Sequence, residues 1–225
     1  IDADKRNQVK EITLDMAGSM QKIAKRCFPG AMQVVDRFHV SKLVYEAVQD
    51  LRIAYRWQVM KDENRKIKEA KAKEESYEPK VFGNGDTLRQ LLARSRYLLF
   101  KAPDKWLQSQ KVRAKLLFEQ FPDIKSVYYY ALRLGKIFSD YTDKDVARAK
   151  LALWYNEIEE FGYDTFTTVA NSIENHYERI LNYFVNRSTN AAAEAFNAKI
   201  KAFRASFRGV VDKRFFLYRL AKVYA

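Results

Sequence analysis

The sequence is poor in cysteine, glycine and proline, with 1 Cys, 7 Gly and 4 Pro among 225 residues. The single Cys27 excludes an internal disulfide and a cysteine zinc cluster, so we expect a reducing compartment. The low Gly and Pro content excludes collagen-like and low-complexity proteins. No apolar run approaches the ~20 residues that a membrane-spanning helix needs. We therefore expect a cytoplasmic protein without membrane contact.

Histidine is also scarce, because His39 and His176 are the only two. This number excludes a histidine-rich metal site. The sequence contains neither a Gly-x-Ser-x-Gly nucleophile elbow nor a glycine-rich phosphate loop. Carboxylates remain the candidate reactive groups. Their oxygen atoms are the ligands that Mg²⁺ prefers, and Mg²⁺ assists phosphoryl chemistry.

Negatively charged residues are fewer than positively charged ones. The chain has 41 Lys and Arg residues and 28 Asp and Glu residues, so its net charge is +13. Hydrophobic residues make up 48% of the chain, which is far too many for a disordered protein. A folded protein with this charge is expected to bind polyanions.

Two short apolar runs are each followed by an acid. Residues 11–14 precede Asp15, and residues 32–35 precede Asp36. Residues 17–28 between them have helical spacing and end at Pro29. This order predicts a parallel strand-helix-strand unit, with both acids at the carboxyl edge of the sheet.

The rest of the chain predicts helices and no convincing third strand, although residues 126–132 fit either. Expected helices span residues 40–75, 88–100, 105–120, 124–139, 143–161, 165–184, 191–205 and 212–225. The fold class is therefore mostly α with a small α/β portion. Residues 61–75 hold six basic and five acidic residues, which predicts a solvated helix with i,i+4 ion pairs rather than a DNA-gripping arm.

Three positions carry candidate acids, each with a structural alternative. Asp15 is a candidate metal ligand or a helix N-cap. Asp36, with His39 three residues later, forms either a polar site or a cap beside a surface histidine. Glu194 is a candidate metal ligand or an i,i+4 partner of a lysine.

Glu194 lies on the polar face of a predicted amphipathic helix. That face consists of Asn190, Glu194, Asn197, Lys201 and Arg204, and the opposite face of Phe196, Ile200, Phe203 and Phe207. Seven basic residues and two acids between positions 187 and 214 give a net charge of +5. A lone acid on a basic face suits a metal ligand beside a DNA backbone.

These segments, in this order, resemble a known family. The motifs are Ile-Thr-Leu-Asp (12–15), Phe-Pro-Gly-Ala (28–31), Val-Val-Asp-Arg-Phe-His (34–39) and Ser-Thr-Asn-x-x-x-Glu-x-x-Asn (188–197). They resemble the catalytic region of bacterial insertion-sequence transposases of the ISL3 type. These are DDE enzymes with an RNase H-like core and a helical insertion.

The resemblance implies roles for individual residues. Asp15 and Glu194 match catalytic, metal-binding carboxylates, and Asp36 is the competing choice for the second catalytic acid. The supporting residues are Asp36, His39, Asn190 and Asn197, and the DNA-binding residues are Arg187, Lys199, Lys201, Arg204 and Arg208. The implied cofactor is Mg²⁺ or Mn²⁺, and the implied reaction is DNA cleavage and strand transfer.

The resemblance also implies three parts of the chain. They are a partial RNase H-like core (1–45), a helical insertion (46–185), and carboxyl-terminal core helices with the catalytic glutamate (186–225). The first catalytic aspartate matches no residue here, and two strands are too few for a stable sheet. We therefore expect a transposase fragment that is inactive alone and binds no metal in isolation.

The implied partners are double-stranded DNA and further copies of the chain, at the bacterial nucleoid. The sequence leaves two other functions open. One is a non-catalytic, basic, helical nucleic-acid-binding protein, and the other is a helical scaffold whose charge serves solubility.

Overall fold

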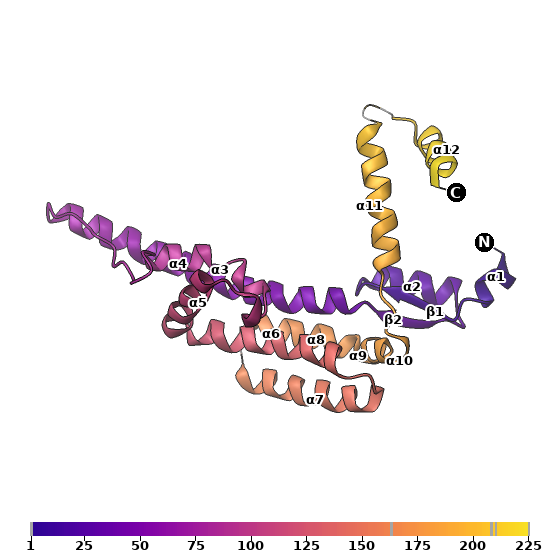
Figure 1. Ribbon diagram of the computed structural model, residues 1–225, viewed down its shortest axis with the longest axis horizontal. Coiled ribbons are helices and arrows are strands. Elements are labelled where there is room, and N and C mark those ends of the chain that lie inside the picture. The colour runs from indigo at the N-terminus through magenta and orange to yellow at the C-terminus, as the bar shows by residue number, and fades with distance from the viewer. Residues whose placement is uncertain (1, 163, 208, 210, 225) are drawn as a thin grey trace.

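The computed structural model describes residues 2–162, 164–207, 209 and 211–224. Helices dominate, and one small sheet lies towards one end of the molecule (Figure 1). The prediction of a mostly α fold with a small α/β portion is confirmed. Within the described part of the chain, no helix combines the length and the apolar character needed to cross a membrane.

The sheet has two parallel strands in which Leu14 lies opposite Val35. The elements of this unit are α1 (Ala3–Asn7), β1 (Glu11–Leu14), α2 (Gly18–Cys27) and β2 (Met32–Val35). The backbone N–H of Asp36 donates to the Leu14 carbonyl at 2.9 Å. The predicted strand-helix-strand unit is thus confirmed, and its ladder continues to the ends of both strands.

α3 (Arg37–Ala72) is one helix of 36 residues. It begins earlier than predicted because the carboxylate of Asp36 caps it, accepting a hydrogen bond from the Phe38 N–H at 2.9 Å. The side chains that it buries in the core are Val40, Val44, Ala47, Val48 and Leu51. Ala54 is exposed, although helical spacing puts it on the same face as Ala47 and Leu51. The boundary expected after residue 45 lies inside this helix.

The carboxyl-terminal end of α3 extends past the packed helices (Figure 1). Arg65 lies 3.2 Å from Asp62 and 3.9 Å from Glu69, which are partners at helical spacing. The prediction of a solvated, ion-paired helix is confirmed.

The remaining helices before residue 187 form a packed body with α3. They are α4 (Leu88–Arg94), η1 (Leu98–Phe100), η2 (Pro103–Lys105), α5 (Gln108–Gln120), α6 (Pro122–Asp140), α7 (Lys144–Phe161), α8 (Asp164–Asn175), α9 (Tyr177–Leu181) and α10 (Tyr183–Asn186). We call residues 37–186 the helical body. α6 and α8 pack against α3, and α7 packs against α6 and α8. Trp154, Tyr128 and Phe138 are among its largest fully buried side chains.

Two predicted helices are interrupted in the structure. The helix expected over 88–100 begins with a capping box between Thr87 and Gln90 and ends at Arg94. The helix expected over 165–184 is divided into α8, α9 and α10. At the first division the ring nitrogens of His176 lie 2.7 Å from the Ser172 carbonyl and 3.1 Å from the Met16 carbonyl.

A buried carboxylate ties α4 to α5 within the helical body. Asp86 is fully buried and accepts hydrogen bonds from Arg94 and, at 2.8 Å each, from Arg113 and Asn84. Burial alone would raise the pKa of Asp86, but the hydrogen bonds from Arg113 and Arg94 outweigh it and lower the pKa below its usual value.

The last two helices stand apart from the helical body (Figure 1). We call α11 (Ala191–Ser206) and α12 (Lys213–Tyr224) the arm. α11 buries none of its residues. Its predicted apolar face meets α12 instead, since the Phe203 ring centroid lies 5.6 Å from that of Phe216 and 6.0 Å from that of Tyr224.

Candidate metal centre

Asp15 and Asp36 follow neighbouring parallel strands, so both lie at the carboxyl edge of the sheet. Asp15 is half-buried, and its Oδ1 accepts a hydrogen bond from the Ala17 N–H at 2.9 Å. This bond closes the turn before α2, whose own N-cap residue, Ala17, contributes no side-chain cap. Oδ2 of Asp15 has no hydrogen-bond partner among the described residues. One oxygen atom therefore stays available at this edge.

Asp36 is 3% exposed and uses both carboxylate oxygens. Oδ1 accepts from the Phe38 N–H at 2.9 Å, and Oδ2 accepts from the Asn190 N–H at 3.0 Å. The first bond caps α3, and the second joins the same carboxylate to the beginning of α11. Two backbone donors and two helix N-termini stabilise the negative charge of Asp36.

The bond to Asn190 brings Glu194 to the sheet edge. Glu194 lies in the first turn of α11, where its N–H donates to the Asn190 carbonyl at 2.9 Å. Ligand atoms of Asp36, His39 and Glu194 all lie within 4.8 Å of one another. Asp36 is buried, His39 half-buried and Glu194 exposed. Asp15 is not part of this cluster.

The cluster fits a divalent cation by distance and by donor type. Two opposite ligands of Mg²⁺, each at about 2.1 Å, are about 4.2 Å apart. Adjacent ligands of the same octahedral ion are about 3.0 Å apart. At least two of the three pairs would be adjacent, so the side chains would have to move closer together to bind one ion. Two carboxylates suit Mg²⁺ or Mn²⁺, and an imidazole is also accepted by transition metals. The hydrogen bonds of Asp36 occupy one lone pair on each oxygen, which leaves the other lone pairs for a cation.

The two predicted supporting amides differ in their surroundings. Asn190 acts through its backbone N–H, which is bonded to Asp36, and its side chain makes no cap. Asn197 is exposed, one turn beyond Glu194.

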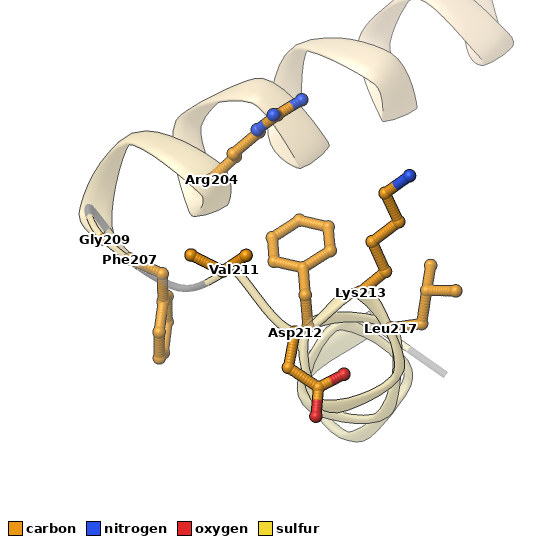
Figure 2. A pocket seen from close by; sticks show the side chains of 8 residues that line it. Arg204, Phe207, Gly209, Val211, Asp212, Lys213 and Leu217 are labelled. Atoms are coloured by element: carbon orange, nitrogen blue, oxygen red, sulfur yellow. The ribbon is translucent and has the colours of Figure 1, made fainter.

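The predicted DNA-binding residues also divide into groups. Lys199, Lys201 and Arg204 are exposed on α11 and form no ion pair with any residue that the structure describes. Arg204 and Lys213 extend to one side of the α11–α12 turn, while the carboxylate of Asp212 points away (Figure 2). Arg208 lies outside the described residues.

Arg187 forms hydrogen bonds within the protein that the sequence did not predict. Its guanidinium donates to the carbonyls of Phe138 at 2.7 Å and Tyr141 at 3.2 Å, at the end of α6. Its backbone is left-handed, with φ at 55°. Arg187 therefore fixes the chain where it leaves the helical body.

Sequence reasoning missed the residues that join the helical body to the sheet. Asn182 Nδ2 donates to the Gln33 carbonyl at 3.0 Å, and Asn186 Nδ2 donates to Glu11 at 2.7 Å. His176 reaches Met16, the neighbour of Asp15. These partners lie about 150 to 175 residues apart in sequence, so no local pattern could reveal them.

The comparisons with known proteins bear on this geometry. The family model of ISL3-type DDE transposases, described as a transposase, matches residues 1–220. This chain belongs to that family. It is thus a transposase by family, and DNA is the substrate that the family implies. DDE transposases use divalent metal ions, and carboxylate oxygens are ligands that such ions accept. Neither a comparison with curated proteins nor one with solved structures found a match to the chain.

Proposed function

We propose that the complete transposase to which this chain contributes Asp15 and Glu194 catalyses divalent-metal-dependent cleavage and strand transfer of double-stranded DNA at insertion-sequence ends. This chain alone would be inactive, because the first catalytic aspartate matches none of its residues. The carboxyl edge of the β1–β2 sheet would be the reaction site. The observation that carries the proposal is the convergence of Glu194 with Asp36 and His39 to within 4.8 Å. In this proposal the chain consists of a partial RNase H-like core (1–45), a helical insertion (46–185) and carboxyl-terminal core helices (186–225). The proposed ion is Mg²⁺ or Mn²⁺. The active form would be a homo-oligomer bound to DNA at the nucleoid.

Asp15 and Glu194 are the proposed metal ligands. Asp15 keeps one oxygen without a hydrogen-bond partner in the described chain, and Glu194 is exposed. Asp36 is instead a proposed positioning residue, because its hydrogen bonds cap α3 and hold the beginning of α11, the helix that carries Glu194. When bound, a divalent ion neutralises charge at the reacting phosphate and makes the attacking hydroxyl more acidic.

A second assignment uses the same edge differently. Here Asp36, His39 and Glu194 would hold the ion together, and Asp15 would only close its turn. The mutual distance of at most 4.8 Å favours this assignment. The two assignments predict opposite outcomes for Asp15 and Asp36.

The exposed cations of α11 are the proposed DNA contacts. Lys199, Lys201 and Arg204 lie on the helix that carries Glu194. They would neutralise phosphates and so make DNA binding salt-dependent. Arg208 belongs to the same proposed set. We expect a smaller contribution from Arg187, since its guanidinium already donates to two carbonyls.

Mn²⁺ binding to the 225-residue chain tests the assignment. Electron paramagnetic resonance would count free Mn²⁺ during titration of the wild type, Glu194→Gln, Asp15→Asn and Asp36→Asn. Asp50→Asn is the matched control, since Asp50 is exposed on α3. The wild-type titration first tests the expectation that the chain binds no metal without the first catalytic aspartate. Where the wild type does bind Mn²⁺, the assignment predicts weaker binding in Glu194→Gln and Asp15→Asn, and wild-type binding in Asp50→Asn.

The remaining outcomes separate the alternatives. Weaker binding in Asp36→Asn with no change in Asp15→Asn would select the second assignment. Unchanged Mn²⁺ binding in Glu194→Gln, with a native circular dichroism spectrum, would contradict both. Salt-dependent DNA binding without any Mn²⁺ site would favour the non-catalytic nucleic-acid-binding protein.

A further inference from the structure

The two backbone carbonyls on either side of Asp15 are held by different parts of the molecule. The Leu14 carbonyl accepts a hydrogen bond from the Asp36 N–H at 2.9 Å, which extends the sheet. The Met16 carbonyl lies 3.1 Å from Nε2 of His176, which stands between α8 and α9 in the helical body. The backbone around Asp15 is therefore fixed both by the sheet and by the helical body.

The contact with His176 acts on a peptide unit that also binds the Asp15 side chain. The Met16 carbonyl and the Ala17 N–H belong to one planar peptide unit. This N–H donates to Oδ1 of Asp15 at 2.9 Å. His176 and the Asp15 carboxylate therefore bind opposite ends of the same peptide unit. A rotation of that unit would turn the N–H away from Oδ1, and the carboxylate would lose the bond that orients it.

His176 is itself held in place within the helical body. Its Nδ1 lies 2.7 Å from the Ser172 carbonyl, and its backbone carbonyl accepts the Ile180 N–H at 2.9 Å. Ile173 and Ile180, which flank it in sequence, are buried. Carbonyl oxygens only accept hydrogen bonds, so the contact with Met16 needs a proton on Nε2. The ring is thus a fixed donor that points at the turn after β1.

We propose that His176 is a positioning residue for Asp15. By holding the Met16–Ala17 peptide unit, it keeps Oδ1 of Asp15 on the Ala17 N–H and leaves Oδ2 as the oxygen available to a metal ion. Hydrogen bonds that orient a metal ligand typically change metal affinity by about 10- to 100-fold when they are removed.

This inference rests on the proposed function, and on the assignment in which Asp15 is a metal ligand. It extends the sheet-edge site to a residue of the helical body that lies 160 positions from Met16 in sequence. The helical body would then do more than bring Glu194 to the sheet edge, because it would also orient the carboxylate opposite.

Nuclear magnetic resonance of the 225-residue chain tests the hydrogen bonds. At pH 7, Nε2 of His176 should be protonated, and a scalar coupling across the hydrogen bond should join the Ala17 amide nitrogen to the carboxyl carbon of Asp15. His176→Gln keeps a donor near the Nε2 position and should retain this coupling. His176→Phe keeps a ring without a donor, and should lose the coupling and exchange the Ala17 amide about five- to tenfold faster, the effect of one hydrogen bond.

Tyr177→Phe is the matched control for this experiment. It removes a neighbouring hydrogen bond, from the Tyr177 hydroxyl to the Arg148 carbonyl at 2.9 Å, that stays within the helical body. The Ala17 amide should be unchanged in this variant. An unprotonated Nε2 in the wild type would overturn the inference, as would an unchanged coupling in His176→Phe. Equally fast Ala17 exchange in Tyr177→Phe would also overturn it, because it would indicate a general loosening.

DNA cleavage by the complete transposase separates this inference from the proposed function. His176→Phe should need about tenfold more Mn²⁺ for half-maximal cleavage, and should reach the wild-type rate at saturating Mn²⁺. His176→Gln should restore most of the Mn²⁺ affinity. Unchanged cleavage in Asp15→Asn would contradict the assignment of Asp15 in the proposed function. Loss of cleavage in Asp15→Asn, with a wild-type Mn²⁺ requirement in His176→Phe, would overturn the role of His176 alone.

Discussion

The helical body and the arm have similar amino acids but differ in how far they bury them. Both contain many aromatic residues at helical spacing. In the body, Trp154, Tyr128 and Phe138 are fully buried, whereas α11 buries no residue. The arm nevertheless carries Glu194 and the exposed cations of the proposed DNA contacts. The difference teaches that the buried side chains that stabilise the fold lie in the body, while the Asn190 N–H at the beginning of the arm is held by Asp36.

The largest expected effect is a loss of stability when a side chain in the core of the helical body is removed. Trp154→Ala removes a fully buried ring and its hydrogen bond to the Tyr130 carbonyl. We expect the free energy of unfolding to fall by about 3–5 kcal/mol in urea denaturation. Trp57→Ala, at an exposed position on α3, should leave it within about 0.5 kcal/mol. Equal losses in the two variants would contradict the distinction between core and surface within the body.

The next largest expected loss of stability follows from removing the buried carboxylate of Asp86. Asp86→Asn leaves Arg94 and Arg113 without their carboxylate, and we expect a loss of about 3 kcal/mol at pH 7. Because the folded state lowers the pKa of Asp86, its contribution is complete above the ordinary pKa of about 4 and disappears as the pH falls through the folded value. Urea denaturation should therefore show wild type and variant converging below pH 4. A constant difference down to pH 2 would contradict this.

A smaller effect tests the attachment of the arm. Asp36→Ala and Asp143→Ala each remove a carboxylate that caps a helix, α3 and α7 respectively. Each should cost about 1–2 kcal/mol of stability. Asp36 alone also accepts from Asn190, so only Asp36→Ala should speed hydrogen exchange in the first turns of α11. Faster exchange of α11 in Asp143→Ala as well would indicate a general loosening rather than a local attachment.

The smallest effect on stability, and the most specific effect on function, is expected in the arm. Lys201→Ala should leave the denaturation midpoint unchanged, because the side chain is exposed. It should reduce the salt slope of duplex DNA binding by about 0.9, the value for one phosphate contact. Lys136→Ala, an exposed lysine of α6, is the control with an unchanged slope.

Much of the fold could be predicted because its signals are local. The strands over 11–14 and 32–35 were evident from short apolar runs. The helix expected from residue 143 begins there, because the Asp143 carboxylate accepts from the N–H groups of Asp145 and Val146. The division at His176 was missed, because a ring bonded to Ser172 and to the distant Met16 decides it. Tertiary contacts of this kind leave no periodic trace in the sequence.

The candidate site was predictable only in part for the same reason. Asp36 and His39 share a strand end and a first helical turn, so their spacing of three residues already predicts proximity. The approach of Glu194 depends on a hydrogen bond between residues 154 positions apart, and only the family resemblance pointed to it. The engagement of Arg187 with two carbonyls follows from the place where α6 ends, which the arginine itself does not encode.

The bond between Asp36 and Asn190 can also be considered as the closure of a polymer loop. Its two ends are 154 residues apart, and closing a flexible loop of that length costs about 4 kcal/mol of chain entropy plus a constant. Here the folded helical body already holds the two ends together. The body thus keeps Asp36 and Asn190 close together, and its exposed residues can change without separating these two residues. What the site requires of the body is a fixed distance between Arg37, where the body begins, and Asn186, where it ends.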